Sequence, residues 1–255
     1  MNGTAPASLH AYRRLSRALT PLLRLMLRRR VARGKEERLR LGEREGHGAA
    51  PPQHGPAIWA HGASVGETAA LLPVLARLTV DRPGLGGVVT TGTVTAARMV
   101  AGRLPPGFVH RYAPLDCAPW VARFLDGWRP ALALRIDSEI WPATLHHLSR
   151  RGVPVILLNG RLSERSARRW RRMPGLARYL IGCFAAIKAQ DEDSAARFAA
   201  LGATEAQLAS PGALKAAAPP PGADPAALAA LRAAIGRRPV WLAASTHPGE
   251  ERIVL

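Results

Sequence analysis

Glu67 is the first side chain in this sequence that is placed to do chemistry. It follows an apolar run, residues 57–61, and a turn of small residues that ends at Ser64. The run predicts a buried strand and the residues from Ser64 onward predict a helix, so Glu67 would stand in the first helical turn. Open α/β sheets bind ligands at the carboxyl ends of their strands. The spacing Ser64-x-x-Glu67 is also that of a capping box, so this stretch alone leaves catalysis and helix capping both open.

Two more carboxylates, Asp137 and Glu139, follow a later apolar run, residues 131–136. A helix is predicted from 139 to 151, so both side chains stand at a turn between a strand and a helix. Such a turn can bring either carboxylate into the crevice at the edge of the sheet. One could orient or neutralise a catalytic base while the other caps the helix.

Several cations and hydroxyls could recognise an anionic group. Thr91 belongs to Thr90-Thr91-Gly92-Thr93, which could cradle a phosphate at a helix N-terminus. Lys215 is a lone cation that follows a second small-residue stretch. Within a helix predicted over 163–181, and just before it, arginines fall at i, i+4, i+7 and i+11. A one-sided arginine face suits phosphate or carboxylate groups, and the alternative is an ordinary solvated face. These arginines are Arg161, Arg165, Arg168 and Arg172.

No metal site, disulfide or cofactor is expected. Cys117 and Cys183 are far apart and form no Cys-x-x-Cys spacing, which fits a reducing cytoplasm. His146 and His147 are adjacent, so they point apart on a helix and do not make a metal-binding pair. The N-terminus lacks the apolar core and cleavage site of a secretory signal.

The charge of the chain predicts a polyanionic partner. Lys and Arg number 36 against 18 Asp and Glu in 255 residues, a formal charge of +18. Nucleic acid, an anionic membrane and a phosphorylated substrate would all fit this excess. A high genomic GC content would also enrich Arg, Ala, Gly and Pro. No nucleic-acid motif is present and few aromatic residues lie among the arginines, so no nucleic-acid partner is expected.

Residues 1–55 predict a basic amphipathic helix followed by a linker. Leucines and Met26 recur near helical spacing among many arginines, and Pro21 interrupts the run. The apolar stretch is too short to span a bilayer, but a helix of this kind can lie in the interface of an anionic membrane. The alternative is a surface helix packed on its own domain.

From residue 56 onward, apolar runs alternate with helical patterns. This alternation predicts an α/β fold, a doubly wound parallel sheet, over residues 56–218. A stiff proline-rich linker then opens a third region, 219–255, with one helix and one strand of a second α/β domain that would continue beyond Leu255. The predicted strands are 57–61, 87–91, 108–112, 131–136, 153–158, 185–189, 207–210 and 240–244. The predicted helices are 64–78, 93–103, 118–126, 139–151, 163–181, 192–201 and 225–235.

An ordered set of motifs resembles the 3-deoxy-D-manno-octulosonic acid (Kdo) transferase family of lipopolysaccharide biosynthesis. Single motifs of this kind would be weak, but their order and approximate spacing hold over residues 10–255. The motifs are His61-Gly-Ala-Ser-Val-Gly-Glu67, Thr90-Thr91, Asp137-Ser-Glu-Ile-Trp-Pro142, Asn159-Gly-Arg-Leu-Ser163 with Arg165-Ser166, Ala189-Gln190, Arg197-Phe198, Gly212-Ala-Leu-Lys215 and Ala244-Ser-Thr-His-Pro-Gly-Glu-Glu251.

The resemblance implies a GT-B glycosyltransferase whose N-terminal Rossmann-like domain holds the acceptor. It implies an inverting, metal-independent transfer of Kdo from CMP-Kdo to a phosphorylated lipid A precursor, lipid IVA, at the cytoplasmic face of a bacterial inner membrane. Glu67 would be the general base, and Asp137 and Lys215 would stabilise the transition state. The family usually has Glu at the position of Asp137, and Phe-Asp where Ala216-Ala217 follow Lys215. The implied acceptor-binding residues are Ser64, Gly66, Thr91, Glu139, Arg161 and Arg165.

Two other readings stay open. The first is another GT-B enzyme, such as a nucleotide-sugar epimerase, that acts on a soluble sugar. The second is a basic module that binds a membrane or nucleic acid without catalysis. With most of the donor-binding domain beyond residue 255, residues 1–255 alone are not expected to turn over.

Overall fold

A computed structural model describes residues 4–48, 56–214, 222–244, 246–250 and 252. Residues 1–218 form one compact unit and residues 219–255 a second. The first unit contains a sheet of seven parallel strands in the order β3-β2-β1-β4-β5-β6-β7. The predicted α/β fold with a parallel sheet is confirmed. The strands are β1 Ala57–Gly62, β2 Gly86–Thr91, β3 Phe108–Tyr112, β4 Leu132–Ile136, β5 Val155–Gly160, β6 Ala186–Ala189 and β7 Leu208–Ala209.

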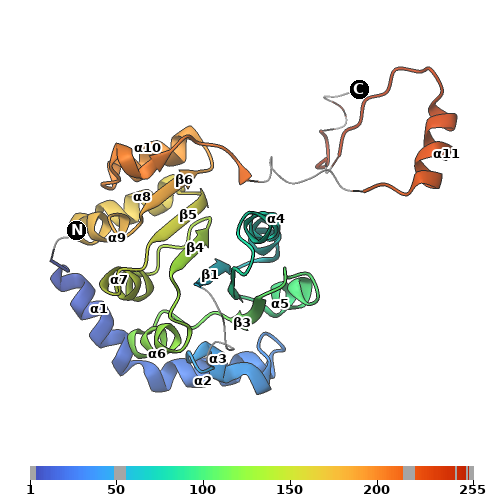
Figure 1. The fold of residues 1–255 in the computed structure, drawn as a ribbon. Helices are drawn as coiled ribbons and strands as arrows, with labels where there is room; N and C mark the ends of the chain where they lie inside the picture. Colours follow the sequence, from blue (N-terminus) through green and yellow to red (C-terminus); the bar gives the residue numbers. More distant parts are fainter. Residues whose placement is uncertain (1–3, 49–55, 215–221, 245, 251, 253–255) are drawn as a thin grey trace. The chain divides into compact units, whose positions relative to one another are not determined.

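Helices cover both faces of this sheet. Helices α4 and α5 lie on one face, and α6, α7 and α9 lie on the other (Figure 1). Strands buried on both faces need apolar side chains in both directions, and β1 and β2 are buried at every position. The helices after β1 are α4 Val65–Asp81, α5 Val94–Val100, α6 Ala118–Trp128, α7 Pro142–Arg150, α8 Glu164–Arg171, α9 Pro174–Ile181 and α10 Glu192–Ala200, with the 3-10 turn η2 at Glu205–Gln207.

Alternation along each strand divides the core between the two faces. Trp59 packs in one cluster, with its ring centroid 4.6 Å from that of Phe124 on α6. Its neighbours Ile58 and Ala60 point the other way, into a cluster with Leu71 of α4. The two clusters hold the sheet between its helix layers.

The direction of winding reverses between β1 and β4. From β1 the chain adds β2 and β3 on one side, and from β4 it adds β5, β6 and β7 on the other. Strands β1 and β4 are direct neighbours, with His61 paired to Arg135 in register. The loops after these two strands therefore leave the sheet side by side, at the position where doubly wound sheets bind ligands.

Two predicted elements differ from the structure because of prolines. The helix predicted over 163–181 is two helices, since Pro174 cannot continue the first and instead begins α9. Arg161 precedes α8, so the four arginines do not share one helix face and that prediction is wrong. The helix predicted from 139 begins at Pro142, which leaves Glu139 in the turn.

The strand predicted over 240–244 is also wrong. The second unit contains the predicted helix, α11 Pro225–Ile235, and no strand among its described residues. Val240, Trp241 and Leu242 are 60%, 59% and 86% exposed. A single apolar run has no ladder partner here, and a strand is stable only when its backbone groups are paired.

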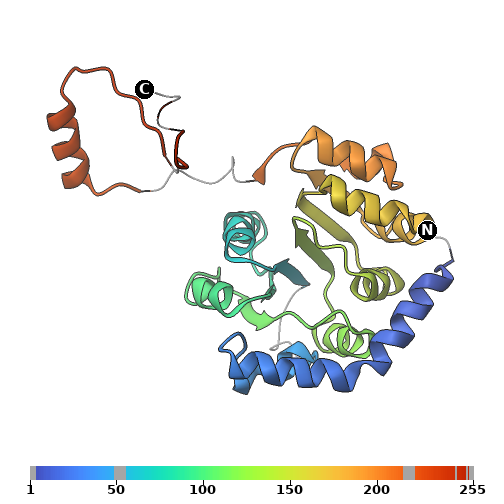
Figure 2. The same cartoon turned by 180° about the vertical axis from the view of Figure 1, so that it is seen from behind.

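The N-terminal segment packs along the outside of the first unit. It contains α1 Ala7–Ala18, α2 Thr20–Ala32, the 3-10 turn η1 Arg38–Arg40 and α3 Leu41–Arg44 (Figures 1 and 2). The helices break at Leu19, with Pro21 in the first turn of α2, so the predicted interruption is confirmed. Leu9 and Leu27 are buried against the domain. None of the helices in the described ranges is both long and apolar enough to cross a membrane.

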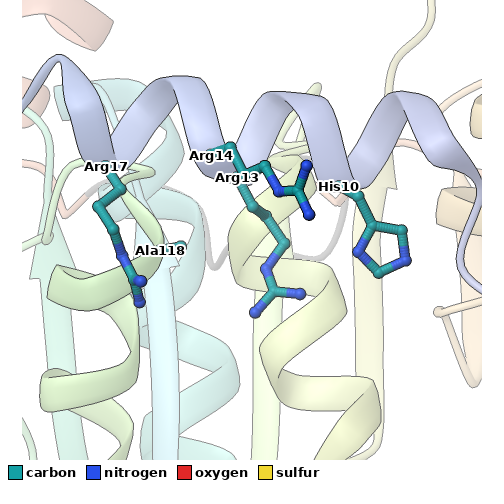
Figure 3. Close-up of a pocket in the computed structure, with 5 residues that line it drawn as sticks. All are labelled: His10, Arg13, Arg14, Arg17 and Ala118. Atoms are coloured by element: carbon teal, nitrogen blue, oxygen red, sulfur yellow. The ribbon is translucent and has the colours of Figure 1, made fainter.

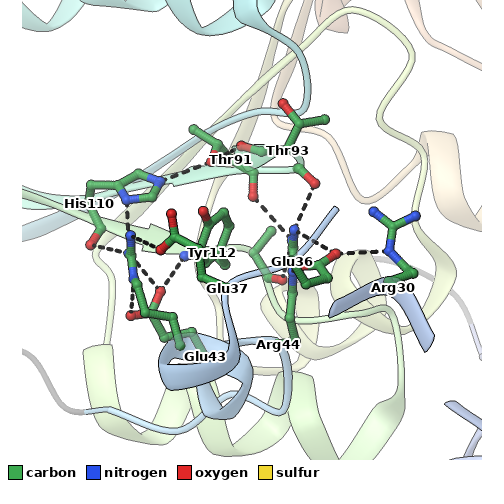
Figure 4. Close-up of polar contacts among 12 residues, drawn as sticks. Arg30, Glu36, Glu37, Glu43, Arg44, Thr91, Thr93, His110 and Tyr112 are labelled. Carbon is green, nitrogen blue, oxygen red and sulfur yellow. Dashed lines mark hydrogen bonds and ion pairs between the residues drawn. The ribbon is translucent and has the colours of Figure 1, made fainter. Parts of the chain in front are cut away.

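Arg44 fastens this segment to the ends of β2 and β3. Its side chain is 3% exposed and forms an ion pair with Glu36, with Nε 2.9 Å from Oε2. It also donates to the carbonyl oxygens of Thr91 at 3.2 Å and Gly92 at 2.7 Å (Figure 4). Nearby, Glu43 accepts the backbone N–H of Tyr112 at 2.6 Å. The N-terminal segment is thus part of the domain and not a separate arm.

Replacing Arg44 with Met should destabilise the first unit by about 2 kcal/mol, because buried carbonyl acceptors lose their donor. Glu36 keeps Arg30 as a partner, with Nε 2.9 Å from Oε1, which limits the loss. The measurement is urea unfolding, with Arg38→Met as a matched control on an exposed arginine. Equal stability of the two variants would show that Arg44 does not hold the segment.

Candidate active site

Glu67 stands in the first turn of α4, immediately after β1. Its Oε2 accepts a hydrogen bond from the backbone N–H of Ala63 at 2.6 Å, and its Oε1 accepts one from the Ser64 hydroxyl at 2.8 Å. The backbone N–H of Glu67 donates to Ser64 Oγ at 3.3 Å, so Ser64 caps α4 as predicted. The reciprocal bond differs from that of a full capping box, because Glu67 accepts the N–H of Ala63 and not that of Ser64. Each carboxylate oxygen has two lone pairs, and the cap uses one on each. The carboxylate is thereby held in place and can still accept a proton.

Three carboxylates, Glu67, Asp137 and Glu139, follow the neighbouring strands β1 and β4 at the reversal point of the sheet, and we call them the acid cluster. Burial raises the pKa of Glu67, and the negative charges of Glu139 and Asp137 raise it further, against the hydrogen bonds from Ser64 and Ala63. The charges act between loops about 70 residues apart in the sequence, which the neighbouring strands β1 and β4 bring to the same edge of the sheet. A carboxylate with a raised pKa is suited to general-base chemistry near neutral pH.

Glu139 is held by a fully buried arginine on β4. Arg135 Nη2 lies 3.3 Å from Glu139 Oε2, and the side chain of Arg135 has no exposed surface. Its guanidinium also lies 4.4 Å from the ring centre of Trp141. Burial by itself would raise the pKa of Glu139, but the contacts with His61 and Arg135 outweigh it and leave that pKa lowered. Glu139 therefore stays ionised at neutral pH.

His61, on β1, contacts Glu139 from the neighbouring strand. Its Nδ1 lies 2.8 Å from Thr90 Oγ1, which also accepts a hydrogen bond from Trp59 Nε1 at 2.8 Å. Its Nε2 lies 3.3 Å from Glu139 Oε2. Burial, followed by the charge of Arg135, lowers the pKa of His61 to about 4, so the ring is neutral at pH 7. The positive charge that balances Glu139 at neutral pH is then that of Arg135.

Asp137 has an unusual backbone conformation, which fixes the direction of its side chain. It has φ 61°, and Asn159 at the end of the neighbouring β5 has φ 52°. Asp and Asn tolerate this left-handed region better than other non-glycine residues. The two side chains are hydrogen-bonded, with Asn159 Nδ2 2.5 Å from Asp137 Oδ1, and Asn159 Oδ1 accepts the N–H of Leu214 at 3.0 Å. Asn159 thus links the acid cluster to the segment that precedes residue 215.

The other predicted site residues have different surroundings. Ser64 caps α4 and is exposed, as is Gly66. Thr91 is fully buried, and its hydroxyl lies 2.9 Å from His110 Nε2, so it faces the protein interior. The side chains of Arg161 and Arg165 are exposed, without an ion pair to any residue that the structure describes. Lys215 lies outside the described residues.

The sequence pattern assigned no role to Arg135, and it placed His61 only within a family motif. The signal for Arg135 was available: it is the one charged residue in an otherwise apolar run, Leu132–Ile136. Among the described residues, no three His, Cys, Asp or Glu side chains are arranged to hold a metal ion. The chemistry available at this edge of the sheet is that of carboxylates beside a buried cation.

Comparison with known proteins identifies the family. Residues 34–218 match the family described as 3-deoxy-D-manno-octulosonic-acid transferase (kdotransferase). The 3-deoxy-D-manno-octulosonic acid transferase of Haemophilus influenzae is 34% identical over 86% of this chain and 52% of its own length. The chain belongs to the Kdo transferase family. A probable mitochondrial 3-deoxy-D-manno-octulosonic acid transferase of Arabidopsis thaliana is 32% identical over 96% of this chain and 56% of its own length.

This membership confirms the resemblance read from the motifs and makes the chain part of a glycosyltransferase family. The chain spans about half the length of these Kdo transferases. Among solved structures, a UDP-bound Staphylococcus aureus MnaA has a TM-score of 0.46 at 10% identity, over 68% of this chain and 50% of that one. A UDP-GlcNAc 2-epimerase from Neisseria meningitidis bound to UDP-GlcNAc has a TM-score of 0.44 at 10% identity, over 60% of this chain and 46% of that one.

Proposed function

We propose that this chain forms the acceptor-binding half of an inverting, metal-independent GT-B transferase that moves Kdo from CMP-Kdo to the phosphorylated lipid A precursor lipid IVA. The observation that carries the proposal is the acid cluster at the reversal point of the sheet, in a member of the Kdo transferase family. Glu67 is its proposed general base, held ready by its cap.

The proposed reaction is one displacement. A hydroxyl oxygen of the acceptor attacks the anomeric carbon of Kdo, and the bond from that carbon to the CMP phosphate oxygen breaks. Glu67 takes the hydroxyl proton, and CMP departs with the bonding electron pair. Glu139, kept ionised by Arg135, keeps the pKa of Glu67 high enough for a base. Asp137 stabilises positive charge at the anomeric carbon, and Lys215 stabilises the departing phosphate.

The remaining assigned residues bind the acceptor. Arg161 and Arg165 are exposed cations without an ion pair among the residues described, and they suit the phosphates of the lipid A precursor. Ser64 and Gly66 are exposed beside Glu67 at the start of α4, and we propose that they contact the acceptor there. Thr91 was predicted among them, but it is fully buried against His110, so in our proposal it supports this edge of the sheet and does not touch the acceptor.

The proposed place of action is the cytoplasmic face of a bacterial inner membrane. Leu15, Leu19, Leu22 and Met26 recur every three or four residues along α1 and α2 and are 58%, 39%, 58% and 39% exposed. Arginines surround them, as in helices that lie in an anionic interface. The packing of α1 and α2 on the domain leaves this stripe outside, so packing and membrane contact are compatible.

The double variant Leu15→Ser/Leu22→Ser should reduce binding to anionic vesicles about tenfold or more, because two apolar side chains no longer enter the interface. Co-sedimentation with phosphatidylglycerol vesicles measures the effect. Point variants are preferable to a deletion of residues 1–45, which would remove Arg44 and Leu27 from the fold. The control is Val80→Ser, on an apolar residue of α4 that is 74% exposed. Unchanged binding by the double variant would place the membrane contact elsewhere.

The direct test of the proposed function uses the protein as its complete gene encodes it. CMP-Kdo and lipid IVA are supplied with and without a chelator, and Kdo-bearing lipid is followed by mass spectrometry. Chelator-insensitive transfer is expected. Activity on a soluble nucleotide sugar in place of transfer to lipid would favour the epimerase reading instead.

A further inference from the structure

A second basic feature lies on α1, away from the acid cluster. A cavity of about 170 Å³ is lined by His10, Arg13, Arg14 and Arg17, with Ala118 at the first turn of α6. The four side chains fall at i, i+3, i+4 and i+7, so they share one side of the helix. Figure 3 shows Arg13 and Arg17 extending from α1 over the helices beneath it. None of these residues belongs to the acid cluster.

The charges around this cavity are not balanced within the described part of the protein. No ion pair there involves His10, Arg13, Arg14 or Arg17, whereas the arginines at positions 24, 30 and 40 each pair with a glutamate. Arg13 Nε is buried without a hydrogen-bond partner among these residues. A buried donor without an acceptor has a free-energy cost, and an anion in the cavity would remove it.

Asp116, which precedes α6, cannot supply that anion. Asp116 accepts hydrogen bonds from Tyr12 Oη at 2.9 Å and from Thr144 Oγ1 at 2.7 Å. It also accepts the backbone N–H groups of Ala143 at 3.0 Å and Thr144 at 2.8 Å. Four donors use the lone-pair positions of one carboxylate, so Asp116 is occupied as the cap of α7.

The local field of the cavity favours an anion. Burial lowers the pKa of His146 to about 4 and that of His147 to about 4, and in both cases the charge of Arg13 lowers it further. Both rings are therefore neutral at pH 7, and the positive charge around them comes from Arg13 of α1 together with Arg150 and Arg151 at the end of α7. Ala118 begins an 11-residue helix, so the positive end of its dipole adds to this field.

We propose that His10, Arg13, Arg14 and Arg17 form a binding site for a phosphate group at the start of α6. Guanidinium groups bind phosphate oxygens in bidentate pairs, and several arginines on one side of a helix can close around one such group. The phosphate could belong to a lipid headgroup or be free in solution. The inference concerns binding alone and does not require transferase activity.

The test compares two triple variants of the same chain that remove equal charge. One is Arg13→Gln/Arg14→Gln/Arg17→Gln, and the control is Arg28→Gln/Arg29→Gln/Arg33→Gln on α2 and its C-cap. Calorimetric titrations use two soluble probes, inorganic phosphate and monomeric dihexanoyl phosphatidic acid. The cavity variant should bind at least about tenfold more weakly than the unmodified chain, and the control should stay within about twofold.

The two probes distinguish the sources of the phosphate. Binding of dihexanoyl phosphatidic acid at least about tenfold tighter than inorganic phosphate would assign the site to a lipid headgroup, and any smaller ratio would assign it to free phosphate. Arg13 is half-buried, so the exposed pair Arg14→Gln/Arg17→Gln serves as a second variant, with its melting temperature checked. No saturable binding of either soluble probe, or equal weakening in both triple variants, would overturn the proposal.

Discussion

Replacing Glu67 with Gln should lower the rate of Kdo transfer by about 10²–10⁴-fold, because the acceptor hydroxyl loses the group that takes its proton. The loss should appear mainly in kcat, since Gln keeps the size and one oxygen acceptor of Glu. The measurement is transfer from CMP-Kdo to lipid IVA by the complete protein. Asp81→Asn, at the other end of α4, is the control and should keep full activity.

The fold should tolerate this change. The amide side chain of the Glu67→Gln variant would retain an oxygen for one of the two donors of the cap, Ala63 N–H or the Ser64 hydroxyl, so the loss is about 0.5–1 kcal/mol. Part of that loss is offset, because burial and two neighbouring carboxylates disfavour the ionised form of Glu67. Turnover at the unmodified rate by a folded Glu67→Gln variant would remove Glu67 from the mechanism.

The same pKa shift gives the pH dependence its direction. Glu67 acts as a base only when ionised, so activity should fall as pH drops through its raised pKa. The acidic limb of the kcat profile should therefore lie above 4.5, the ordinary value for a glutamate. For stability the sign is the reverse: a raised carboxyl pKa favours the fold at low pH, and that contribution is lost as pH rises through it.

Replacing Glu139 with Gln should destabilise the first unit by about 3–5 kcal/mol. The reason is Arg135, which is fully buried and would keep its charge without an anion. Its Nε and Nη1 already lack hydrogen-bond partners among the described residues, so the guanidinium depends strongly on the single contact with Glu139. Contact with the ring of Trp141 would compensate only in part.

The double variant Arg135→Met/Glu139→Gln supplies the control. Removing the cation along with its partner should recover most of the lost stability, since Met fills the space without a charge. Urea unfolding of the two single variants and the double variant measures the coupling. Additive losses would mean that Arg135 and Glu139 do not act as a pair.

The ion pair of Arg135 and Glu139 should also affect how the stability of the fold depends on acidic pH. The lowered pKa of Glu139 stabilises the fold at pH values above the ordinary carboxyl pKa, and this contribution is lost as pH falls through the lowered value. The Glu139→Gln variant should lack this part of the pH dependence. A stability profile below pH 5 that is parallel to that of the unmodified chain would contradict the assignment.

Much of the fold could be predicted from local pattern. Apolar runs separated by helical periods indicated a parallel sheet, and β3 and α11 have the predicted bounds. The predicted elements were wrong where a proline ended a helix or where an apolar run lacked a partner strand among the described residues. Pro174 divides a predicted helix in two, and residues 240–244 find no partner strand among the described residues of the second unit. Proline acts locally and could have been weighed, whereas strand pairing depends on distant residues.

The sequence by itself determined which acidic residues follow the two apolar runs, the helix cap at Ser64 and the family motifs, because these are properties of short stretches. Only the tertiary structure decided that β1 and β4 are neighbours, and thus that Glu67 and Glu139 lie at the same edge of the sheet. It also decided that Arg135 supports Glu139 and that Thr91 faces inward. Burial and charge pairing depend on residues far apart in the chain, which no local pattern specifies.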